Sequence, residues 1–192
     1  MQKVDLYRVQ YLTGCFEKVN TQSIALKVLK KYYAKKNMSD SIHSIRHEDI
    51  RIDFDSEIQD LAQLQIKAWK DAYDADIEWC WDSTMTTDDP NTAAWAVVHG
   101  KGESTNVHSH ETEDNYIAGA QVSSAFWVQC PPDSGDFVFM YKTNPYTTEL
   151  HEIQPKVGHF AMFDSTIQHY VTKNFTDQLR IVISMNFKFS DK

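Results

Sequence analysis

Three features that define other protein classes are scarce in this 192-residue chain: cysteines, long apolar runs and positive charge. Cys15, Cys80 and Cys130 lie far apart without C-x-x-C spacing, which excludes a disulfide framework or zinc ribbon and predicts free thiols in a reducing compartment. No apolar run approaches the roughly 20 residues that span a bilayer, and the first residues lack the apolar core of a signal peptide. We therefore expect a cytoplasmic protein without membrane contact.

The charge balance narrows the class of partner. The formal net charge is −8, which argues against a nucleic-acid backbone as the main partner, because phosphate binding needs a basic surface. Ten Phe, nine Tyr and five Trp supply enough apolar surface for one substantial core. We expect a single domain over residues 1–192 that acts on a small-molecule or peptidyl substrate, and the sequence leaves its oligomeric state open, a homodimer included.

The first part of the chain, residues 1–75, carries two helical patterns. An apolar stripe runs through residues 19–37, with Asn20 or Thr21 placed to cap its start and lysines near its end. A second stripe starts near residue 55 and ends about Tyr73. These patterns predict a helical N-terminal layer.

Less regular segments follow each helix. A loop and a short strand at about Ile50–Phe54 are expected between the helices, and His43 and His47 are interpreted as solvated loop residues. The acidic and aromatic segment 76–90 is a candidate for part of a substrate pocket. His99, His151 and His159 are interpreted as strand or turn residues.

From about residue 92 to residue 190 the chain alternates short β-rich runs with turn residues, a pattern typical of a sandwich or barrel. The architecture expected from this pattern is α+β and mainly β, with the N-terminal helices packed on a sheet. The runs are AAWAVVH, SAFWVQC, DFVFMYK, GHFAMFD and LRIVISMNFKF.

Three histidines are candidate metal ligands. His108 and His110 occur in NVHSHE (106–111), and residues two apart on an extended backbone face the same side, so both imidazoles can reach one ion while Glu111 points away. His169 follows the apolar run GHFAMF and is the third candidate. Imidazole is a common ligand of Fe, Zn, Cu and Ni.

Arg180 opens the most apolar run of the chain, LRIVISMNF. A charged side chain enters such a strand only when it is paired, and guanidinium forms two parallel hydrogen bonds with a carboxylate. Near metal-binding histidines, an arginine is suited to the far carboxylate of a dicarboxylate co-substrate. The structural alternative is an ion pair with a nearby Asp or Glu.

The stretch from Trp95 to Phe189 resembles 2-oxoglutarate- and Fe(II)-dependent oxygenases that carry His-x-His in place of the commoner His-x-Asp. The resemblance covers about half of the chain and implies a double-stranded β-helix, also called a jelly-roll or cupin-like fold. The blocks that carry the resemblance, in order, are WAVVHGKGESTNVHSH, SSAFWVQCPPDSG, IQPKVGHFAMFDSTIQHYV and LRIVISMNF.

The resemblance also implies roles by position. His108 and His169 become Fe(II) ligands, His110 takes the place of the usual carboxylate, and Arg180 binds the C5 carboxylate of 2-oxoglutarate. The implied activity is hydroxylation, for example of a prolyl or other amino acid side chain, coupled to decarboxylation of 2-oxoglutarate to succinate. The Arg-x-Ser pattern of the family is lost here, but Ser184 lies on the same face as Arg180 by two-residue alternation and can supply the hydroxyl.

Several alternatives stay open at this point. In one, His108 binds the metal, His110 lies beside it, and an acidic residue completes the ligand set; the acidic candidates are Glu111, Glu113 and Asp114. In another, the protein is a three-histidine cupin-type metal enzyme that does not use 2-oxoglutarate. A third alternative is a non-catalytic jelly-roll binding module with a structural metal or none.

Overall fold

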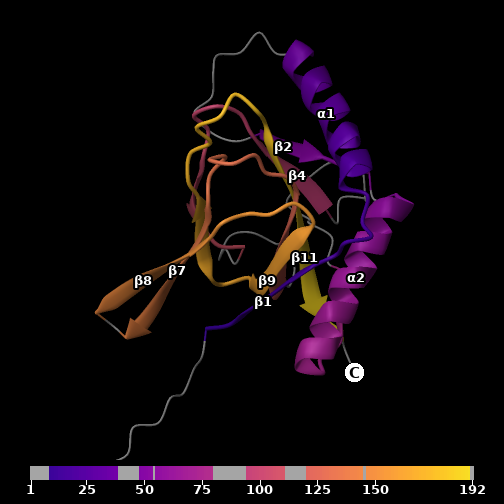
Figure 1. Cartoon of the computed structure of the whole chain (residues 1–192). Helices are drawn as coiled ribbons and strands as arrows, with labels where there is room; N and C mark the ends of the chain where they lie inside the picture. Colours follow the sequence, from indigo (N-terminus) through magenta and orange to yellow (C-terminus); the bar gives the residue numbers. More distant parts are fainter. Residues whose placement is uncertain are drawn as a thin grey trace, which may run out of the picture.

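The computed structural model describes residues 9–38, 48–53, 55–79, 94–110, 120–144 and 146–190. Two antiparallel sheets face each other, and two helices cover the outer face of the larger sheet (Figure 1). Several sequence expectations fall outside the described residues and stay untested: the loop histidines His43 and His47, most of segment 76–90, and the acidic candidates Glu111, Glu113 and Asp114.

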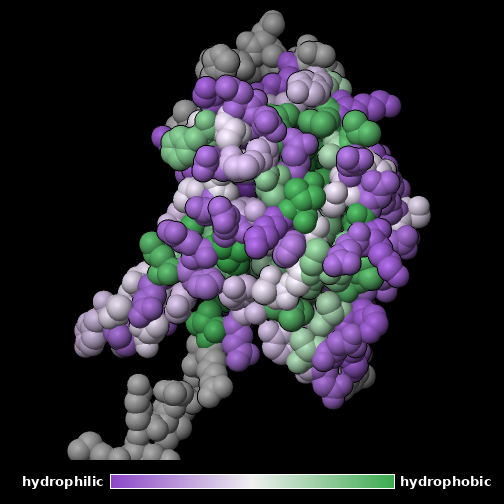
Figure 2. Space-filling view, in the orientation of Figure 1, coloured by the Kyte–Doolittle hydropathy of each residue, from purple (hydrophilic) through white to green (hydrophobic). Residues whose placement is uncertain are grey.

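The two helices match their predicted boundaries. Helix α1 spans Thr21–Met38, and the Asn20 side chain accepts a hydrogen bond from the Ser23 amide at 3.1 Å, which makes it the N-cap. Helix α2 spans Ser56–Tyr73 and is capped in the same way by Asp55. The outer face of α2 is hydrophilic (Figure 2). Neither helix is long and apolar enough to cross a membrane.

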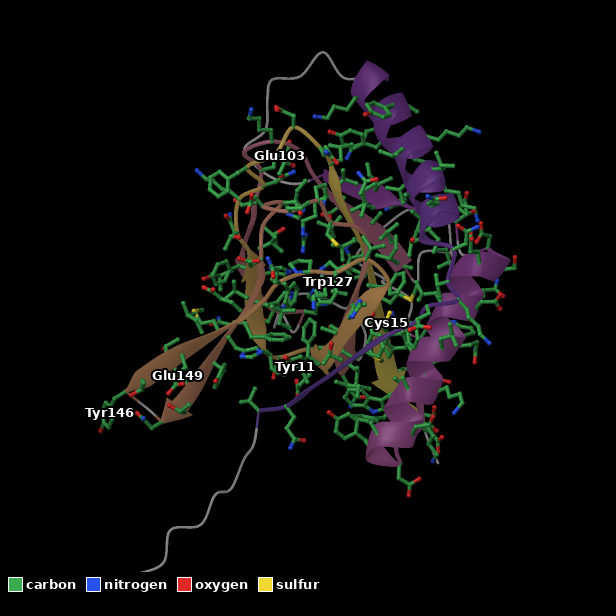
Figure 3. All side chains as sticks on the ribbon, in the orientation of Figure 1. Tyr11, Cys15, Glu103, Trp127, Tyr146 and Glu149 are labelled. Carbon is green, nitrogen blue, oxygen red and sulfur yellow. The ribbon has the colours of Figure 1, made fainter. Side chains whose placement is uncertain are left out.

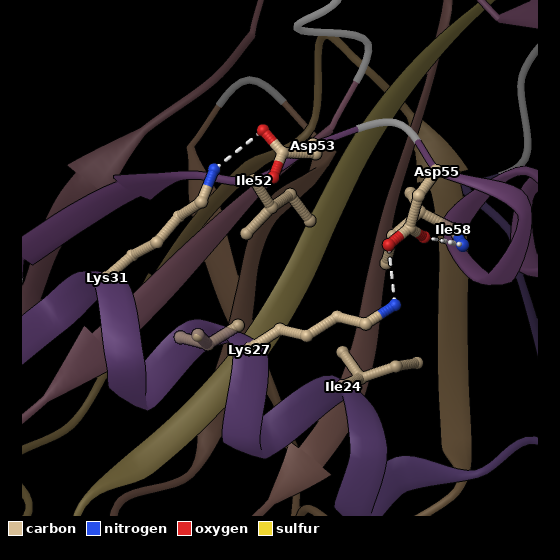
Figure 4. Close-up of a pocket in the computed structure, with 8 residues that line it drawn as sticks. Ile24, Lys27, Lys31, Ile52, Asp53, Asp55 and Ile58 are labelled. Carbon is tan, nitrogen blue, oxygen red and sulfur yellow. Dashed lines mark hydrogen bonds and ion pairs between the residues drawn. The ribbon is translucent and has the colours of Figure 1, made fainter.

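Ion pairs connect α1 to the segment that leads into α2. Lys31 bonds Asp53 at 2.8 Å, and Lys27 bonds Asp55 (Figure 4). Lys27 also pairs with Glu57. These ion pairs surround a small pocket whose floor is apolar. Because the charged groups are already paired with one another and partly exposed, we interpret this pocket as part of the contact between α1 and the segment before α2, and not as a ligand site.

The larger sheet has seven strands, and the strand order explains how distant segments meet. Its order is β1 (Tyr11–Cys15), β9 (His159–Asp164), β6 (Val122–Gln129), β11 (Arg180–Phe189), β4 (Ala94–His99) and β2 (Glu48–Arg51), with β3 (Ile77–Trp79) paired to the end of β11. Strand β2 begins and ends a few residues earlier than predicted. The predicted run LRIVISMNFKF forms the central strand β11.

The smaller sheet has four strands, in the order β5 (Thr105–His108), β10 (Gln168–Val171), β7 (Phe137–Asn144) and β8 (Thr147–Ile153). From β4 to β11 the chain passes repeatedly between the two sheets, which is the winding of a double-stranded β-helix. This confirms the predicted fold class. The β7–β8 hairpin projects beyond the sheets, with Tyr146 near its tip (Figure 3).

Side-chain alternation along β11 separates two apolar cores. Ile181, Ile183 and Met185 face the helices, whereas Val182 faces the smaller sheet together with Trp127. Phe126 packs on the helix side, so it and Trp127 point to opposite faces of the sheet. The polar residues in phase with Val182 therefore face the space between the sheets.

Strands β1, β3, β8 and β10 were not predicted from the sequence, and β1 and β8 show why. Strand β1 adds an edge to the larger sheet within the part interpreted as a helical layer. Strand β8 is exposed over nearly its whole length and therefore lacks the apolar alternation that marks a strand. Both form because an antiparallel neighbour supplies hydrogen bonds, which a single sequence does not reveal.

Gly135 is the glycine with the least room for a side chain. Its φ is +98°, and a Cβ would overlap the carbonyl oxygen of Thr172, on the segment that leads from His169 to Arg180. We expect Gly135→Ala to lower the free energy of unfolding by about 3 kcal/mol or more, through backbone strain and overlap together. Gly102→Ala is the control: its φ is +79° in open space, so only the left-handed backbone costs energy, about 1–2 kcal/mol. Equal losses in chemical denaturation would contradict this account.

Candidate metal centre

His108, His110 and His169 converge, as predicted. His108 ends β5 and is paired directly with His169 on β10, and the two ring centroids lie 4.2 Å apart. His110 follows two residues later, where its backbone N–H donates to the Ser165 carbonyl at 2.9 Å. One ligand nitrogen from each ring lies within 4.8 Å of the other two. Sheet pairing and the turn after β5 therefore bring three imidazoles to one point.

The hydrogen bonds of His108 and His169 set the tautomer of each ring. His108 Nδ1 lies 2.9 Å from the Asn106 carbonyl, and His169 Nδ1 lies 2.9 Å from the Ile167 carbonyl. A carbonyl only accepts, so the proton is on Nδ1 and the lone pair is on Nε2. Both rings therefore offer Nε2 as a metal ligand, held by the carbonyl that their other nitrogen binds.

His110 is oriented by side chains instead of the backbone. Its Nδ1 lies 2.7 Å from Asn186 Oδ1 and 2.7 Å from Ser123 Oγ. Ser123 is fully buried and Asn186 is nearly so. With a proton on Nδ1, His110 also directs Nε2 toward the other two histidines.

Burial keeps His169 in the form that binds metal. Its ring is buried and packs against Phe137 and Phe163. This burial lowers the pKa of His169 well below its usual 6.5, and the neighbouring His108 and His110 lower it further. Neutral imidazole is the ligand form, so the site is ready for a cation at neutral pH.

The lowered pKa of His169 predicts how the metal-free protein responds to acid. The unfolded chain binds this proton near pH 6.5 and the folded chain only at lower pH, so protons favour unfolding in the interval between the two values. Above about pH 6.5 neither the folded nor the unfolded chain binds this proton, so His169 no longer makes the free energy of unfolding depend on pH. We expect the free energy of unfolding to fall as pH drops below about 6.5, and the fall to be smaller in His169→Gln. Denaturation curves across this interval, with equal slopes in both proteins, would contradict the prediction.

The residues present fit Fe(II). Metal–nitrogen bonds of about 2.1 Å place neighbouring ligand atoms about 3 Å apart. The three nitrogens already lie within 4.8 Å of one another, so small side-chain rotations that move each by about an ångström or two would bring them to that spacing. Three neutral imidazoles suit iron as well as zinc, copper and nickel. No carboxylate joins this cluster among the described residues.

Arg180 lies on the central strand with its guanidinium inside the fold. It is 1% exposed, and its Nη1 donates to His99 Nδ1 at 3.3 Å. The described residues give no hydrogen-bond partner to its Nε or Nη2. Burial lowers the pKa of Arg180 to about 10, partly offset by Cys130 and Asp136, so the group stays a cation at neutral pH.

The space between the sheets holds hydrogen-bond donors that meet no acceptor in the part of the chain that the structure describes. Trp127, whose buried Nε1 is one of them, lies there near the middle of the fold (Figure 3). Ser184 is buried on the same face as Arg180, in agreement with two-residue alternation. A buried cation beside unpaired donors is a site for an anion, because only an acceptor removes the cost of their burial.

Three residues of this site were missed by sequence reasoning. His99 was interpreted as an ordinary strand residue, yet it is fully buried, accepts from Arg180 and contacts Thr105 Oγ1 through Nε2 at 2.8 Å. Asn186 and Ser123, the partners of His110, lie far from it in the sequence. The sequence does place these polar residues at positions of apolar strands that alternate toward the interior, and a buried polar residue needs a hydrogen-bond partner.

Comparison with known proteins agrees with this geometry. Residues 93–186 match the family described as "Putative 2OG-Fe(II) oxygenase". No curated protein sequence matches the chain.

Solved structures share the fold at low sequence identity. A prolyl-4-hydroxylase from Pseudomonas putida is 11% identical with a TM-score of 0.58, covering 95% of this chain and 94% of its own. HygX from Streptomyces hygroscopicus, solved with nickel and 2-oxoglutarate, is 10% identical with a TM-score of 0.61, covering 94% and 83%. A Trichoplax adhaerens prolyl hydroxylase in complex with a hypoxia inducible factor peptide is 14% identical with a TM-score of 0.58, covering 93% and 83%.

The family match spans β4 to Asn186, and so includes all three histidines and Arg180. The winding of the two sheets and the three-histidine cluster agree with that match. Through residues 93–186, this chain belongs to the 2-oxoglutarate- and Fe(II)-dependent oxygenases.

Proposed function

We propose that this oxygenase is a hydroxylase of an amino acid side chain, free or within a peptide, with Fe(II) held by His108, His110 and His169. The observation that carries the proposal is the pairing of two features: three imidazoles that converge within 4.8 Å, and a buried guanidinium with two nitrogens to which the described residues give no hydrogen-bond partner. The first suits a cation and the second an anion. A dicarboxylate co-substrate that chelates the metal at one end and meets Arg180 at the other uses both.

Each protein group has a distinct task in this proposal. Fe(II) with bound 2-oxoglutarate would supply the oxidising power with O2 as the oxidant: one oxygen atom would enter succinate as 2-oxoglutarate loses CO2, and the other would be inserted into a substrate C–H bond. The histidines fix the metal through Nε2 while their Nδ1 atoms stay engaged. Arg180 orients the C5 carboxylate, and His99 holds Nη1 so that Nε and Nη2 are directed to the ligand.

Charge balance supports the same assignment. A three-histidine set leaves the full double charge of Fe(II), and 2-oxoglutarate carries two negative charges that offset it. The Arg180 cation then serves as an extra attraction for the far carboxylate in a dry environment, where electrostatic interactions are strong. Trp127 Nε1 and the Ser184 hydroxyl are further donors on that side of the space between the sheets.

The substrate class rests on the solved structures that share the fold. Two of them are prolyl hydroxylases, one of which is bound to a peptide. We expect succinate release from 2-oxoglutarate to rise when L-proline or a proline-containing peptide is added to the Fe(II)-loaded protein, with a mass increase of one oxygen in the prolyl compound. Succinate formation that no amino acid or peptide stimulates would contradict the substrate assignment while leaving the co-substrate assignment intact.

A second candidate function is favoured by one observation: the groups that converge here are three histidines, with no carboxylate among them in the described part of the chain. Three-histidine sites also serve cupin-type enzymes whose substrate chelates the metal directly, and Arg180 would then bind a carboxylate of that substrate. The two candidates differ in stoichiometry, because only the first produces one succinate for each oxidised substrate.

A further inference from the structure

The surroundings of His110 differ from those of the other two histidines. His108 and His169 each donate to a backbone carbonyl two residues earlier. His110 instead meets a buried polar cluster, the His110 clamp, made of Ser123, Ser165 and Asn186. All three clamp residues are 1% exposed or less, and the Asn186 Nδ2 has no hydrogen-bond partner among the described residues.

Two hydrogen bonds of the clamp meet at the Asn186 amide oxygen. Ser165 Oγ lies 2.8 Å from Ser123 Oγ, and the Ser123 hydroxyl donates to Asn186 Oδ1 at 2.9 Å. His110 Nδ1 lies 2.7 Å from the same Oδ1. An amide oxygen accepts and does not donate, so the proton between the two residues belongs to His110 Nδ1. Asn186 Oδ1 is therefore the acceptor at which the clamp ends.

We propose that Asn186, supported by Ser123, is the positioning residue that holds His110 in its Nδ1–H tautomer and thereby makes its Nε2 a metal ligand. In many metal sites a carboxylate performs this task on a ligating histidine. Here a neutral amide performs it. The proposal rests on the proposed metal centre for its purpose, but the tautomer itself is a property of the metal-free protein.

A neutral clamp has a consequence for the co-substrate. It orients His110 without adding negative charge beside the metal, so the cation keeps its full attraction for a dianion. Asn186→Asp keeps an acceptor at the same place and adds a charge. We expect this variant to retain metal affinity and to bind 2-oxoglutarate about tenfold more weakly, since the added carboxylate repels the dianion.

The tautomer is measured directly by long-range ¹H–¹⁵N NMR of the ring nitrogens in the metal-free protein. We expect a proton on Nδ1 of His110 in the wild type and in Asn186→Asp. In Ser123→Ala/Asn186→Leu both acceptors are lost, and we expect the Nε2–H form to appear. Retention of the pure Nδ1–H form in the double variant would overturn the proposal.

Metal affinity is measured in parallel by anaerobic titration with Co(II) alone, followed by its visible absorption. We expect Ser123→Ala/Asn186→Leu to bind Co(II) about 10–100-fold more weakly, the range for losing such a support. Ser124→Ala is the matched control, because Ser124 is equally buried on the same strand but bonds Gln65 on the helix side. We expect its Co(II) affinity to equal that of the wild type.

His110→Ala distinguishes the role of His110 as a metal ligand from the role of Asn186 in positioning it. Weaker Co(II) binding in His110→Ala, with unchanged binding in the clamp double variant, would overturn only the role of Asn186. Unchanged Co(II) binding in His110→Ala itself would show that His110 is no ligand, and would overturn the three-histidine centre together with its clamp.

Discussion

Replacement of Arg180 by methionine is expected to weaken 2-oxoglutarate binding by about 100-fold or more, because loss of one partner of a buried charge pair costs 2–5 kcal/mol. The same change is expected to stabilise the ligand-free protein by about 1–4 kcal/mol, since it removes a buried cation without a hydrogen-bonded acid and fills the space with an apolar chain. Arg180 is 1% exposed, and two of its nitrogens have no hydrogen-bond partner within the described ranges. Arg180→Met is therefore expected to lower the affinity for 2-oxoglutarate and to raise the free energy of unfolding of the ligand-free protein.

The two effects are measured by titration of the Fe(II)-loaded protein with 2-oxoglutarate and by denaturation without ligands. Lys101→Met is a suitable control, because Lys101 pairs with Asp177 on the exposed surface and its loss changes stability little. If Arg180→Met lowered stability and left 2-oxoglutarate affinity unchanged, Arg180 would have a structural role, as in the alternative of an ion pair with a nearby Asp or Glu.

Replacement of His108 by alanine is expected to weaken Fe(II) binding more than about 100-fold, which exceeds the effect of losing a supporting hydrogen bond. His108 is the suitable ligand for this test because its ring is only partly buried, so its removal leaves little cavity. Helix and sheet content, followed by circular dichroism, should therefore match the wild type. Turnover of 2-oxoglutarate should disappear with the metal.

His151→Ala is the control for this variant. His151 is exposed on β8 and bonds the Tyr11 hydroxyl at 2.9 Å, apart from the metal cluster. We expect unchanged Fe(II) affinity. An equal loss of Fe(II) affinity in both variants would show that His108 acts through general stability and not as a ligand.

The sequence predicted the fold class and singled out three histidines that lie together in the structure, while their role as ligands stays a prediction. His108 and His110 were paired from two-residue spacing, and His169 and Arg180 from their place beside apolar strands, because those patterns are local. The predicted helices agree with α1 and α2 since caps and apolar stripes are local as well. Strands β1 and β8 were missed because their stability comes from neighbouring strands.

The residues that position His110 and Arg180 were also missed, because their contacts depend on which strands lie side by side. Asn186 meets His110 only because β11 lies next to β6 and because the chain after β5 brings His110 to both strands. Likewise His99 supports Arg180 through the pairing of β4 with β11. Contacts between residues this far apart depend on strand order and register, which a single sequence does not determine.

The central claim is that three histidines and Arg180 together hold Fe(II) and 2-oxoglutarate, and one measurement tests it most directly. The protein is loaded anaerobically with Fe(II) and titrated with 2-oxoglutarate while the weak visible charge-transfer absorption of the chelate is followed. We predict a saturable band in the wild type, no band in His108→Ala, and a band in Arg180→Met only at about 100-fold higher 2-oxoglutarate. A wild-type protein that binds Fe(II) but shows no band, or a band unaffected by Arg180→Met, would contradict the claim.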